Sequence, residues 1–290
     1  MVKKYSELYL DARKALLPTD GMYAANMARE LLCAASGKTA EAIVADRDLY
    51  ASEEICARIE DYVARHIAGE PTAYIIGEWD FFGMTLTVNR NVLIPRDDTV
   101  AVTELAIKKA VFLPQNPRIL DLCTGSGCIG IAIAKRVQDA RVTLGDASPD
   151  ALKVAKKNVA DCQLSARATC MPIDVTKPAA AFLGKFDLIV SNPPYVTTAE
   201  MEKLDDSVKN FEPHIALHGG EDGLDFYRAI LDNFTPVLNP GGFICFEFGM
   251  GQETAVSELL LQHGFENIEL KRDNSYIIRA VAAQLKREDA

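Results

Sequence analysis

The segment SNPPY, Ser191–Tyr195, directly follows the apolar run Phe186–Val190. Neither proline can donate to a sheet ladder, and each restricts the residue before it, so a strand has to stop here. The Asn192 side chain offers one acceptor and two donors, and the Pro193 carbonyl is a second acceptor held by a rigid dipeptide. Two converging acceptors suit a planar –NH2 group, and the ring of Tyr195 adds a flat face. The segment therefore indicates a site for a carboxamide or an exocyclic amine.

A glycine-rich turn, DLCTGSGCIG, occupies residues 121–130 at the end of a second apolar run. Such a turn between a parallel strand and a helix lets a ligand approach the backbone and meet its amide N–H groups. Taken literally, Gly125-x-Gly127-x-x-Gly130 is the dinucleotide fingerprint. The motif alone is weakly specific, because a turn that only lets helix and strand pack has the same glycines.

Two acidic residues follow at the ends of the next predicted strands. Asp146 ends RVTLGD and could accept hydrogen bonds from both hydroxyls of a ribose. The alternative is that it only caps the next helix, but Ser148 with Pro149 behind it already supplies that cap. Asp174 ends MPID, where an adenine amino group could be recognised; a solvated loop carboxylate is an equally good interpretation.

The elements that position these residues alternate from about residue 100 onwards. Helical spacing separates runs that predict strands: RILDLC, RVTLGD, ATCMPID, FDLIVSN, GGFICFEF, NIELKRD and YIIRAVA. This alternation predicts an α/β fold with an open, mainly parallel sheet and helices on both faces. In such sheets ligands lie beyond the carboxyl ends of the strands, so the four features above should meet at one edge.

The first 70 residues predict helices only. In Ser52–Ala68 an N-cap serine and two acidic residues precede an apolar face, and Gly69 ends the helix. Earlier segments, divided by LLPTDG and ASGK, have helical spacing as well; they are Tyr5–Leu16, Met22–Ala35 and Ala40–Val44. The aromatic and β-branched stretch AYIIGEWDFFGMTLTVNRNVLIPR then predicts a β-hairpin. The expected domains are a helical bundle (1–72), a hairpin linker (73–98) and an α/β domain (99–290).

Composition narrows the possible functions. The net charge of −10 disfavours an extended phosphate-binding surface, which needs clustered Lys and Arg. The first residues lack the apolar stretch of a signal peptide, and no run approaches transmembrane length. The seven cysteines form no CxxC pair, so buried reduced thiols are expected rather than zinc ligands or disulfides, and a cytoplasmic location fits best.

Four motifs together, DLCTGSG, SNPPY, IPRDDT and GGEDGLDFY, resemble the peptide chain release factor N5-glutamine methyltransferases, the PrmC or HemK family. The resemblance continues back through GEPTAYIIGEWDFFG and forward through LNPGGFICFEFGMGQ. NPPY by itself is shared with adenine-N6 methyltransferases and is only moderately specific. The narrower match depends on the hairpin, on FEPHIALHGGEDGLDFY and on the N-terminal helical domain.

The resemblance implies a Rossmann-like class I fold that uses S-adenosylmethionine. It implies that Asp121 leads into the cofactor-binding loop, which consists of Cys123, Thr124, Gly125, Ser126 and Gly127. It assigns Asp146 to the ribose and Asp174 with Val175 to the adenine. It assigns the methyl-accepting glutamine to Asn192, Pro193, Pro194 and Tyr195, with Asn192 also beside the cofactor. That glutamine belongs to the Gly-Gly-Gln motif of release factors, the helical domain helps to dock them, and no metal is involved.

The sequence departs from the family pattern in four places. Cys123 stands where glycine is usual, Val175 replaces a common aromatic residue, and RDDT with Asp98 replaces Arg-Pro-Glu-Thr. The segment RDNSYIIR is shorter than the usual loop before the last strand. None of these changes removes a group that the chemistry needs.

The expected reaction is in-line displacement at the methyl group of S-adenosylmethionine by the glutamine side-chain nitrogen. Hydrogen bonds to Asn192 and Pro193 would stabilise positive charge developing on that nitrogen, and no strong general base is evident.

Methylation of a ribosomal-protein glutamine is an alternative that the sequence does not separate from methylation of a release factor. An adenine-N6 methyltransferase would need a basic groove, yet residues 1–70 hold 9 Lys and Arg against 12 Asp and Glu. A nicotinamide dehydrogenase is a further alternative, but it would give the SNPPY segment no function. A nucleotide-binding adaptor is another, and such a protein would bind the cofactor without transferring a methyl group.

Overall fold

The computed structural model describes residues 2–287, and these form two compact units. One unit, called the helical unit below, comprises Met1–Glu78 together with Asp206–Phe211. The other, called the sheet unit, comprises Trp79–Asp205 and Glu212–Ala290. Among the described helices none is long and apolar enough to span a membrane.

The helical unit is built from short amphipathic helices around its own apolar core. The Ser52 hydroxyl accepts a hydrogen bond from the Ile55 N–H, which is the N-cap predicted for the fourth helix. The core is formed largely by leucine, alanine and isoleucine side chains, among them the fully buried Leu16, Leu31 and Leu32. The helices are α1 Tyr5–Asp20, α2 Ala24–Ser36, α3 Ala40–Ala45, α4 Glu53–Ile67, α5 Thr72–Ile76 and α10 Asp206–Phe211.

Two predictions in this region are wrong. The segment LLPTDG was expected to end the first helix, but α1 continues through Pro18 to Asp20. Pro18 lies in the last turn, where it removes only one helical hydrogen bond, and burial of Leu16 stabilises the helix there. Residues 73–76 were expected to belong to the hairpin, but they form α5, which ends at Gly77 with φ +84°. Ile75 is buried in the helical core, so packing outweighs the β propensity of this stretch.

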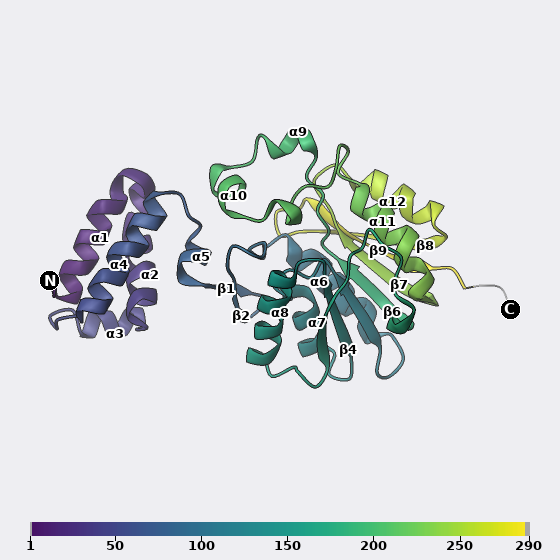
Figure 1. Ribbon diagram of the computed structural model, residues 1–290, viewed down its shortest axis with the longest axis horizontal. Coiled ribbons are helices and arrows are strands. Elements are labelled where there is room, and N and C mark those ends of the chain that lie inside the picture. Colours follow the sequence, from purple (N-terminus) through teal and green to yellow (C-terminus); the bar gives the residue numbers. More distant parts are fainter. Residues whose placement is uncertain (1, 288–290) are drawn as a thin grey trace. The chain divides into compact units, whose positions relative to one another are not determined.

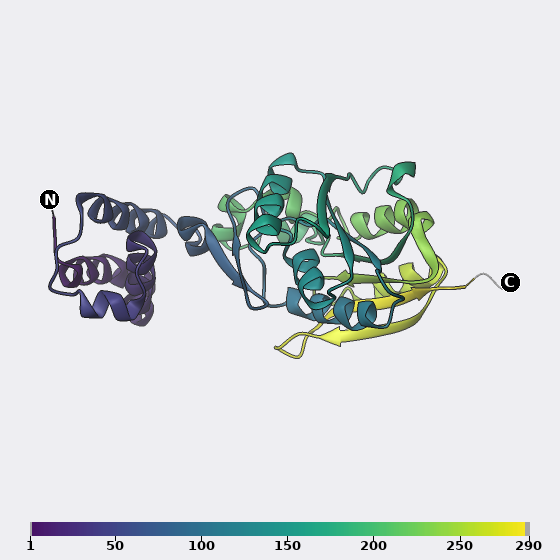
Figure 2. The same ribbon diagram turned by 90° about the horizontal axis from the view of Figure 1, so that it is seen from below.

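The sheet unit contains the predicted open, mainly parallel sheet, which is confirmed (Figure 1). Its strand order is β5-β4-β3-β6-β7-β9-β8, in which β9 pairs antiparallel with both β7 and β8. Figure 2 shows β8 and β9, in yellow, at one edge. The seven strands are β3 Arg118–Leu122, β4 Arg141–Asp146, β5 Ala168–Pro172, β6 Phe186–Ser191, β7 Leu238–Glu247, β8 Phe265–Arg272 and β9 Ile278–Leu285.

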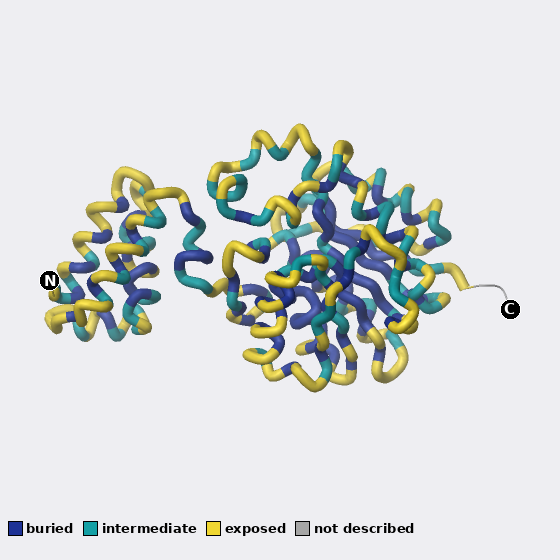
Figure 3. The backbone as a smooth tube through the Cα atoms, viewed as in Figure 1, coloured by how far each residue is buried: buried dark blue, intermediate teal, exposed yellow. Residues whose placement is uncertain are grey.

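Helices cover both faces of this sheet, as predicted. Neighbouring strand residues alternate between the faces, so that Ile119 packs on one side and Leu120 on the other. One face is covered by α6 Thr99–Val111 and α7 Cys128–Arg136, with α8 Pro149–Asp161 beside them. The other is covered by α11 Asp225–Phe234 and α12 Glu253–Gln262, and the short helix α9 is Thr198–Met201. The strands between these layers are largely buried, as the dark tube in Figure 3 shows.

A two-stranded hairpin precedes the sheet. Its strands are β1 Glu78–Phe81 and β2 Met84–Thr87. The two turn residues, Phe82 and Gly83, both have positive φ, as a two-residue hairpin turn requires. Met84 and Leu86 are buried in the core that α6 and α7 share, which fixes the hairpin to the sheet unit.

Candidate active site

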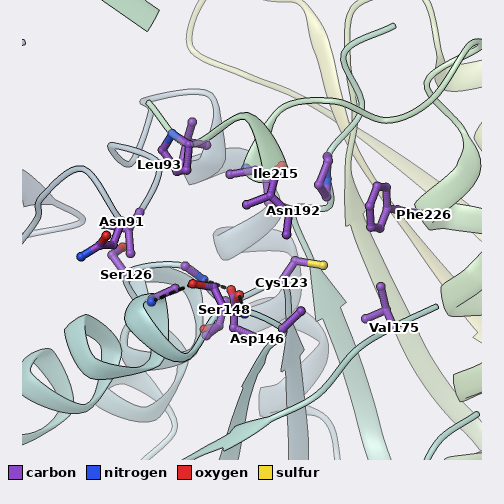
Figure 4. A pocket seen from close by; sticks show the side chains of 18 of the residues that line it. Asn91, Leu93, Cys123, Ser126, Asp146, Ser148, Val175, Asn192, Ile215 and Phe226 are labelled. Atoms are coloured by element: carbon purple, nitrogen blue, oxygen red, sulfur yellow. Dashed lines mark hydrogen bonds between the residues drawn. The ribbon is translucent and has the colours of Figure 1, made fainter. Parts of the chain in front are cut away.

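A cavity of about 270 Å³ opens at the carboxyl ends of β3, β4 and β6. The predicted site residues that line it come from four separate segments, as Figure 4 shows for several of them. They are Cys123, Thr124, Gly125, Ser126, Asp146, Asp174, Val175, Asn192 and Pro194. Four others, Asp121, Gly127, Pro193 and Tyr195, are not among the lining residues. The convergence of the glycine turn, both acidic residues and SNPPY at one edge of the sheet follows from the parallel strands.

The glycine turn is held by a carboxylate beneath it. Asp121 is fully buried, and its Oδ2 accepts hydrogen bonds from the Thr124 hydroxyl at 2.5 Å and from the Gly130 N–H at 2.9 Å. A Cβ on Gly130 would lie 2.8 Å from that same oxygen, so only glycine lets the helix approach the strand this closely. Burial raises the pKa of Asp121 to about 7. Asp121 therefore shapes the loop from below.

Asp146 connects the second strand to the glycine turn. Its Oδ2 accepts from the Gly125 N–H and its Oδ1 from the Ser148 N–H, each at 2.9 Å. The Ser148 hydroxyl caps α8 separately by accepting from the Ala151 N–H, as predicted. Burial raises the pKa of Asp146, and these backbone donors oppose the rise. Each carboxylate oxygen keeps a further acceptor position beside the cavity.

Cys123 has a backbone conformation that favours glycine, although it carries a side chain. Its φ is +55°, in the left-handed region, which costs a residue with a Cβ about 1–2 kcal/mol. Its thiol lies in the cavity between Val175 and Asn192 (Figure 4). Burial raises the pKa of this thiol, so it remains protonated.

Asp174 and Val175 line the cavity beyond the end of β5. Asp174 Oδ1 accepts from the hydroxyl and the N–H of Thr176, and its Oδ2 pairs with Lys177 Nζ at 2.9 Å. These partners lower the pKa of Asp174 to about 2. An aromatic side chain is also present, because Phe226 from α11 lines the cavity near Val175 (Figure 4). Phe226 is thus a candidate for the flat contact that an aromatic residue at position 175 would have supplied.

The SNPPY segment begins at the last residue of β6. The Ser191 hydroxyl donates to the Leu122 carbonyl at 2.7 Å and joins this strand end to that of β3. Asn192 points its side chain to the cavity, and its Nδ2 donates to the Thr99 hydroxyl at 3.4 Å. The strand therefore delivers the amide next to the glycine turn.

The backbone after the prolines is held by distant residues. Gln252 Nε2 donates to the Tyr195 carbonyl at 3.1 Å, and Gln252 Oε1 accepts from the Gly249 N–H at 2.9 Å. A Cβ on Gly223 would lie 2.4 Å from that same Tyr195 carbonyl oxygen. A Cβ on Gly219 would lie 2.7 Å from the Pro194 carbonyl oxygen. The glycines of GGEDGLDFY thus let a loop pass directly against SNPPY.

Two buried polar residues near the cavity were not predicted from the sequence. Asn158, on α8, accepts from the Thr87 N–H and donates to the carbonyls of Thr87 and Ser126, all within 2.9 Å. It therefore fastens the hairpin to the glycine turn. Its only sequence signal is an asparagine inside a helix, where that residue is mildly unfavourable.

The second is Glu212, whose carboxylate is almost fully buried and binds the loop before α6. Its Oε2 accepts from the Ile94 N–H at 3.2 Å, and its Oε1 pairs with Arg96. The segments on either side, 91–95 and 213–216, both contribute lining residues. A carboxylate in FEPH gives no local sign of this role. Asp98, the residue that departs from the family pattern, pairs with Arg279 at 3.2 Å.

All seven cysteines are free thiols. Within residues 2–287 no group of three or more His, Cys, Asp or Glu side chains could hold a metal ion.

Comparison with known proteins identifies the architecture. The family model described as the PrmC N-terminal domain matches residues 7–77, and that of the methyltransferase small domain matches residues 103–210. A solved methyltransferase from Pyrococcus furiosus is similar in fold, with a TM-score of 0.51 at 16% identity over 79% of this chain and 97% of that one.

Sequence relatives give a narrower result. The release factor glutamine methyltransferase of Clostridium acetobutylicum is 39% identical over 241 residues, which cover 83% of this chain and 84% of that protein. The protein of the same name from Geobacter sulfurreducens is 37% identical over 279 residues, or 95% of each chain. The chain is therefore a methyltransferase that belongs to the release factor glutamine methyltransferase family.

Proposed function

We propose that this enzyme transfers the methyl group of S-adenosylmethionine to the side-chain nitrogen, N5, of the glutamine in the Gly-Gly-Gln motif of peptide chain release factors. The observation that carries the proposal is that Asn192 lines the same cavity as the glycine turn and Asp146. An amide that can hold an –NH2 group thus lies beside a cofactor-type pocket. Because release factors act at the ribosome, the reaction belongs in the cytoplasm.

The cavity residues fit S-adenosylmethionine. Asp146 has acceptor positions left for the ribose hydroxyls, and the backbone at Gly125 is open, with no atom within 4 Å of a Cβ built there. Val175 and Phe226 are apolar faces for the adenine, and Asp174 is an acceptor beside them. The carboxyl groups of Asp146 and Asp174, which line the cavity, also favour a cationic ligand. Bound here, the cofactor would supply a methyl group on a sulfonium that leaves readily.

The roles of the protein groups follow from their donors and acceptors. Asn192 Oδ1 and the Pro193 carbonyl would accept the two hydrogens of the substrate –NH2, with Pro194 and Tyr195 forming the walls. These acceptors would stabilise the positive charge that develops on nitrogen, and holding the two reactants together supplies an effective molarity on the order of 10⁵ M or more. The helical domain, expected over residues 1–72 with a linker at 73–98 and the catalytic domain at 99–290, would dock the release factor.

The test offers labelled S-adenosylmethionine with four acceptors: a release factor, the same factor with its Gly-Gly-Gln glutamine changed to alanine, a mixture of ribosomal proteins, and duplex DNA. We expect label on the intact release factor only. We expect Asn192→Ala to lower kcat about 10³-fold because it removes an acceptor that faces developing charge. Label on DNA alone, label on the glutamine-free factor, or an Asn192→Ala enzyme as active as wild type would refute the proposal.

A further inference from the structure

Two loops of the sheet unit, residues 91–95 and 213–216, border the opening of the cavity and are called the mouth below. Ile215 lines the cavity and is nevertheless 63% exposed, so it lies where the cavity meets solvent. Figure 4 shows Leu93 and Ile215 on the other side of the cavity from Asp146. A substrate that reaches Asn192 from solvent would therefore pass the mouth.

Glu212 lies directly before the second loop of the mouth and binds the first. Its Oε2 accepts from the Ile94 N–H at 3.2 Å, its Oε1 pairs with Arg96, and its side chain is 1% exposed. Ile94 and Arg96 are the two neighbours of Pro95, which lines the cavity and has no N–H to donate. Pro213 disfavours helical backbone at Glu212, so α10 ends before it and the carboxylate is free to reach the first loop.

The first loop is fixed at its other end as well. Asn158 binds the N–H and the carbonyl of Thr87, just before this loop, and also the carbonyl of Ser126 in the glycine turn. Within the loop, Val92 and Ile94 are buried. The first loop is thus a fixed support, to which Glu212 attaches the second.

The chemistry of the mouth suits one kind of side chain. All lining residues that the two loops contribute are uncharged, and most are apolar, among them Leu93, Pro95, Pro213 and Ile215. A glutamine side chain has two methylene groups before its neutral amide, so its stem can contact these apolar groups. A charged side chain would lose its hydration there without gaining a partner.

We propose that Glu212 is a positioning residue that holds the two loops of the mouth together, so that the glutamine side chain enters towards Asn192. The inference rests on the proposed function and deepens it, because it assumes that a protein glutamine is the substrate. Neither Glu212 nor Arg96 is among the residues that line the cavity, so both act through the loops that they join.

The Glu212→Gln variant tests the proposal with a release factor as substrate. Its amide has the shape of the carboxylate but only one acceptor oxygen, so either the Ile94 N–H or Arg96 is left facing an –NH2 group. We expect kcat/KM for the release factor to fall about 10-fold or more, because the glutamine is held less precisely. The Kd for S-adenosylmethionine, measured by calorimetric titration, should change less than about threefold.

Asp187→Asn is the matched control. The Asp187 carboxylate also accepts from one backbone N–H, that of Arg118 at 2.9 Å, and from one side chain, Asn239 Nδ2 at 2.7 Å. It lies near the start of β6, at the opposite end of that strand from SNPPY. Asp187→Asn should lower the midpoint of thermal unfolding, as Glu212→Gln should, yet keep kcat/KM within about threefold of wild type.

Three results of this comparison would overturn the proposal. The first is a Glu212→Gln enzyme whose kcat/KM stays within about threefold of wild type. The second is an equal loss of kcat/KM in Asp187→Asn, which would make the effect one of general stability. The third is a rise in the Kd for S-adenosylmethionine as large as the loss in kcat/KM.

Substitutions at Arg96 supply a second measurement, which decides the matter even if Glu212→Gln does not fold. The Arg96 side chain is 39% exposed, so the protein should tolerate its truncation. Arg96→Ala should lower kcat/KM about 10-fold, whereas Arg96→Lys, which keeps a cation for Glu212, should stay within about threefold of wild type. Equal kcat/KM values for the two variants would contradict the role of the Glu212–Arg96 pair.

A double variant separates the pair from any independent action of Arg96. In the Glu212→Gln background, Arg96→Ala should lower kcat/KM by less than about twofold further, because the pair is already broken. A full additional loss would show that Arg96 acts without Glu212 and would overturn the proposal. Failure of the underlying function is distinguishable: a wild-type enzyme that labels no release factor refutes that function and this inference together, whereas an active wild type with unaffected variants refutes the inference alone.

Discussion

The glycine turn and the SNPPY segment each follow a parallel strand, but they are held in place in different ways. In the glycine turn, Asp121 binds groups three and nine residues away in the chain, at Thr124 and Gly130. SNPPY depends on partners far away in the chain: the Asn192–Thr99 bond spans 93 residues and the bond from Gln252 to Tyr195 spans 57. The first site is therefore shaped by its own sequence and the second by the completed fold. Substitutions should separate the two.

The largest expected effect comes from adding one methyl group where a distant loop passes SNPPY. In Gly223→Ala the new Cβ would lie 2.4 Å from the Tyr195 carbonyl oxygen and 2.5 Å from Gln252 Nε2, so the clamp has to shift. We expect kcat to fall about 100-fold, as a displacement near 1 Å does in active sites, while cofactor affinity changes little. Steady-state kinetics and calorimetric titration with S-adenosylmethionine measure the two quantities.

Gly264→Ala is the matched control for this substitution. Its φ of +82° is as unfavourable for alanine as the +75° of Gly223, but no atom lies within 4 Å of its Cβ. It should lose stability without losing kcat. Similar kcat values for the two alanine variants would show that SNPPY tolerates movement of its support.

The next effect concerns the glycine turn and the cofactor. Asp146→Asn places an amide where two backbone N–H groups converge, and it removes a charged acceptor. We expect the Kd for S-adenosylmethionine to rise about 10- to 100-fold. Asp174→Asn should change it about threefold or less, because Asp174 is half-exposed and already bonded to Thr176 and Lys177. An equal rise of the Kd in both variants would show that the different surroundings of Asp146 and Asp174 do not make their contributions to cofactor binding differ.

A smaller effect is expected on the pH dependence of stability. Burial raises the pKa of Asp121 to about 7, whereas an unfolded carboxyl titrates near 4, so the folded state holds a proton over this range that the unfolded state releases. The contribution of Asp121 to the free energy of unfolding therefore falls as pH rises from about 4 to 7. Asp121→Asn removes this loss. The free energy of unfolding of the variant minus that of wild type should therefore be about 2 kcal/mol larger at pH 7.5 than at pH 5.

Urea denaturation at the two pH values measures this difference. The control is Asp150→Asn on the exposed start of α8, which should show the same difference from wild type at both. A difference between Asp121→Asn and wild type that does not change with pH would show that the buried carboxylate does not titrate in this range.

The smallest effect isolates backbone strain in the glycine turn. Cys123→Ala and Cys123→Gly both remove the sulfur, but only alanine keeps a Cβ at φ +55°. The glycine variant should be more stable than the alanine variant by about 1 kcal/mol, measured by thermal unfolding. Equal stability, or a more stable alanine variant, would indicate that the turn adapts to a side chain without cost.

The same contrast explains what could be predicted from the sequence. The end of β6 at SNPPY, the position of Asp146 at the end of β4 and the Ser148 cap all depend on neighbouring residues, and the sequence shows them. The sequence around Asn158 and Glu212 does not reveal their partners, because these lie 71 and 116 residues away. α5 was predicted wrongly for the same reason, since burial of Ile75 decides its conformation. Secondary-structure propensity depends on neighbouring residues, whereas the conformations and partners of these residues depend on the tertiary fold.

The helical unit includes a short piece, Asp206–Phe211, that is separated from the rest of it by more than half of the sheet unit. Phe211 lies in contact distance of a Cβ built on Gly69, within that unit. During synthesis from the N-terminus the first 78 residues leave the ribosome early, but the unit becomes complete only after residue 211 has emerged. By then four of the seven strands of the large sheet, β3 to β6, have emerged, and the last three, β7, β8 and β9, have not. A nascent chain stopped near residue 80 would therefore expose a surface at Gly69 that a chain stopped after residue 211 covers.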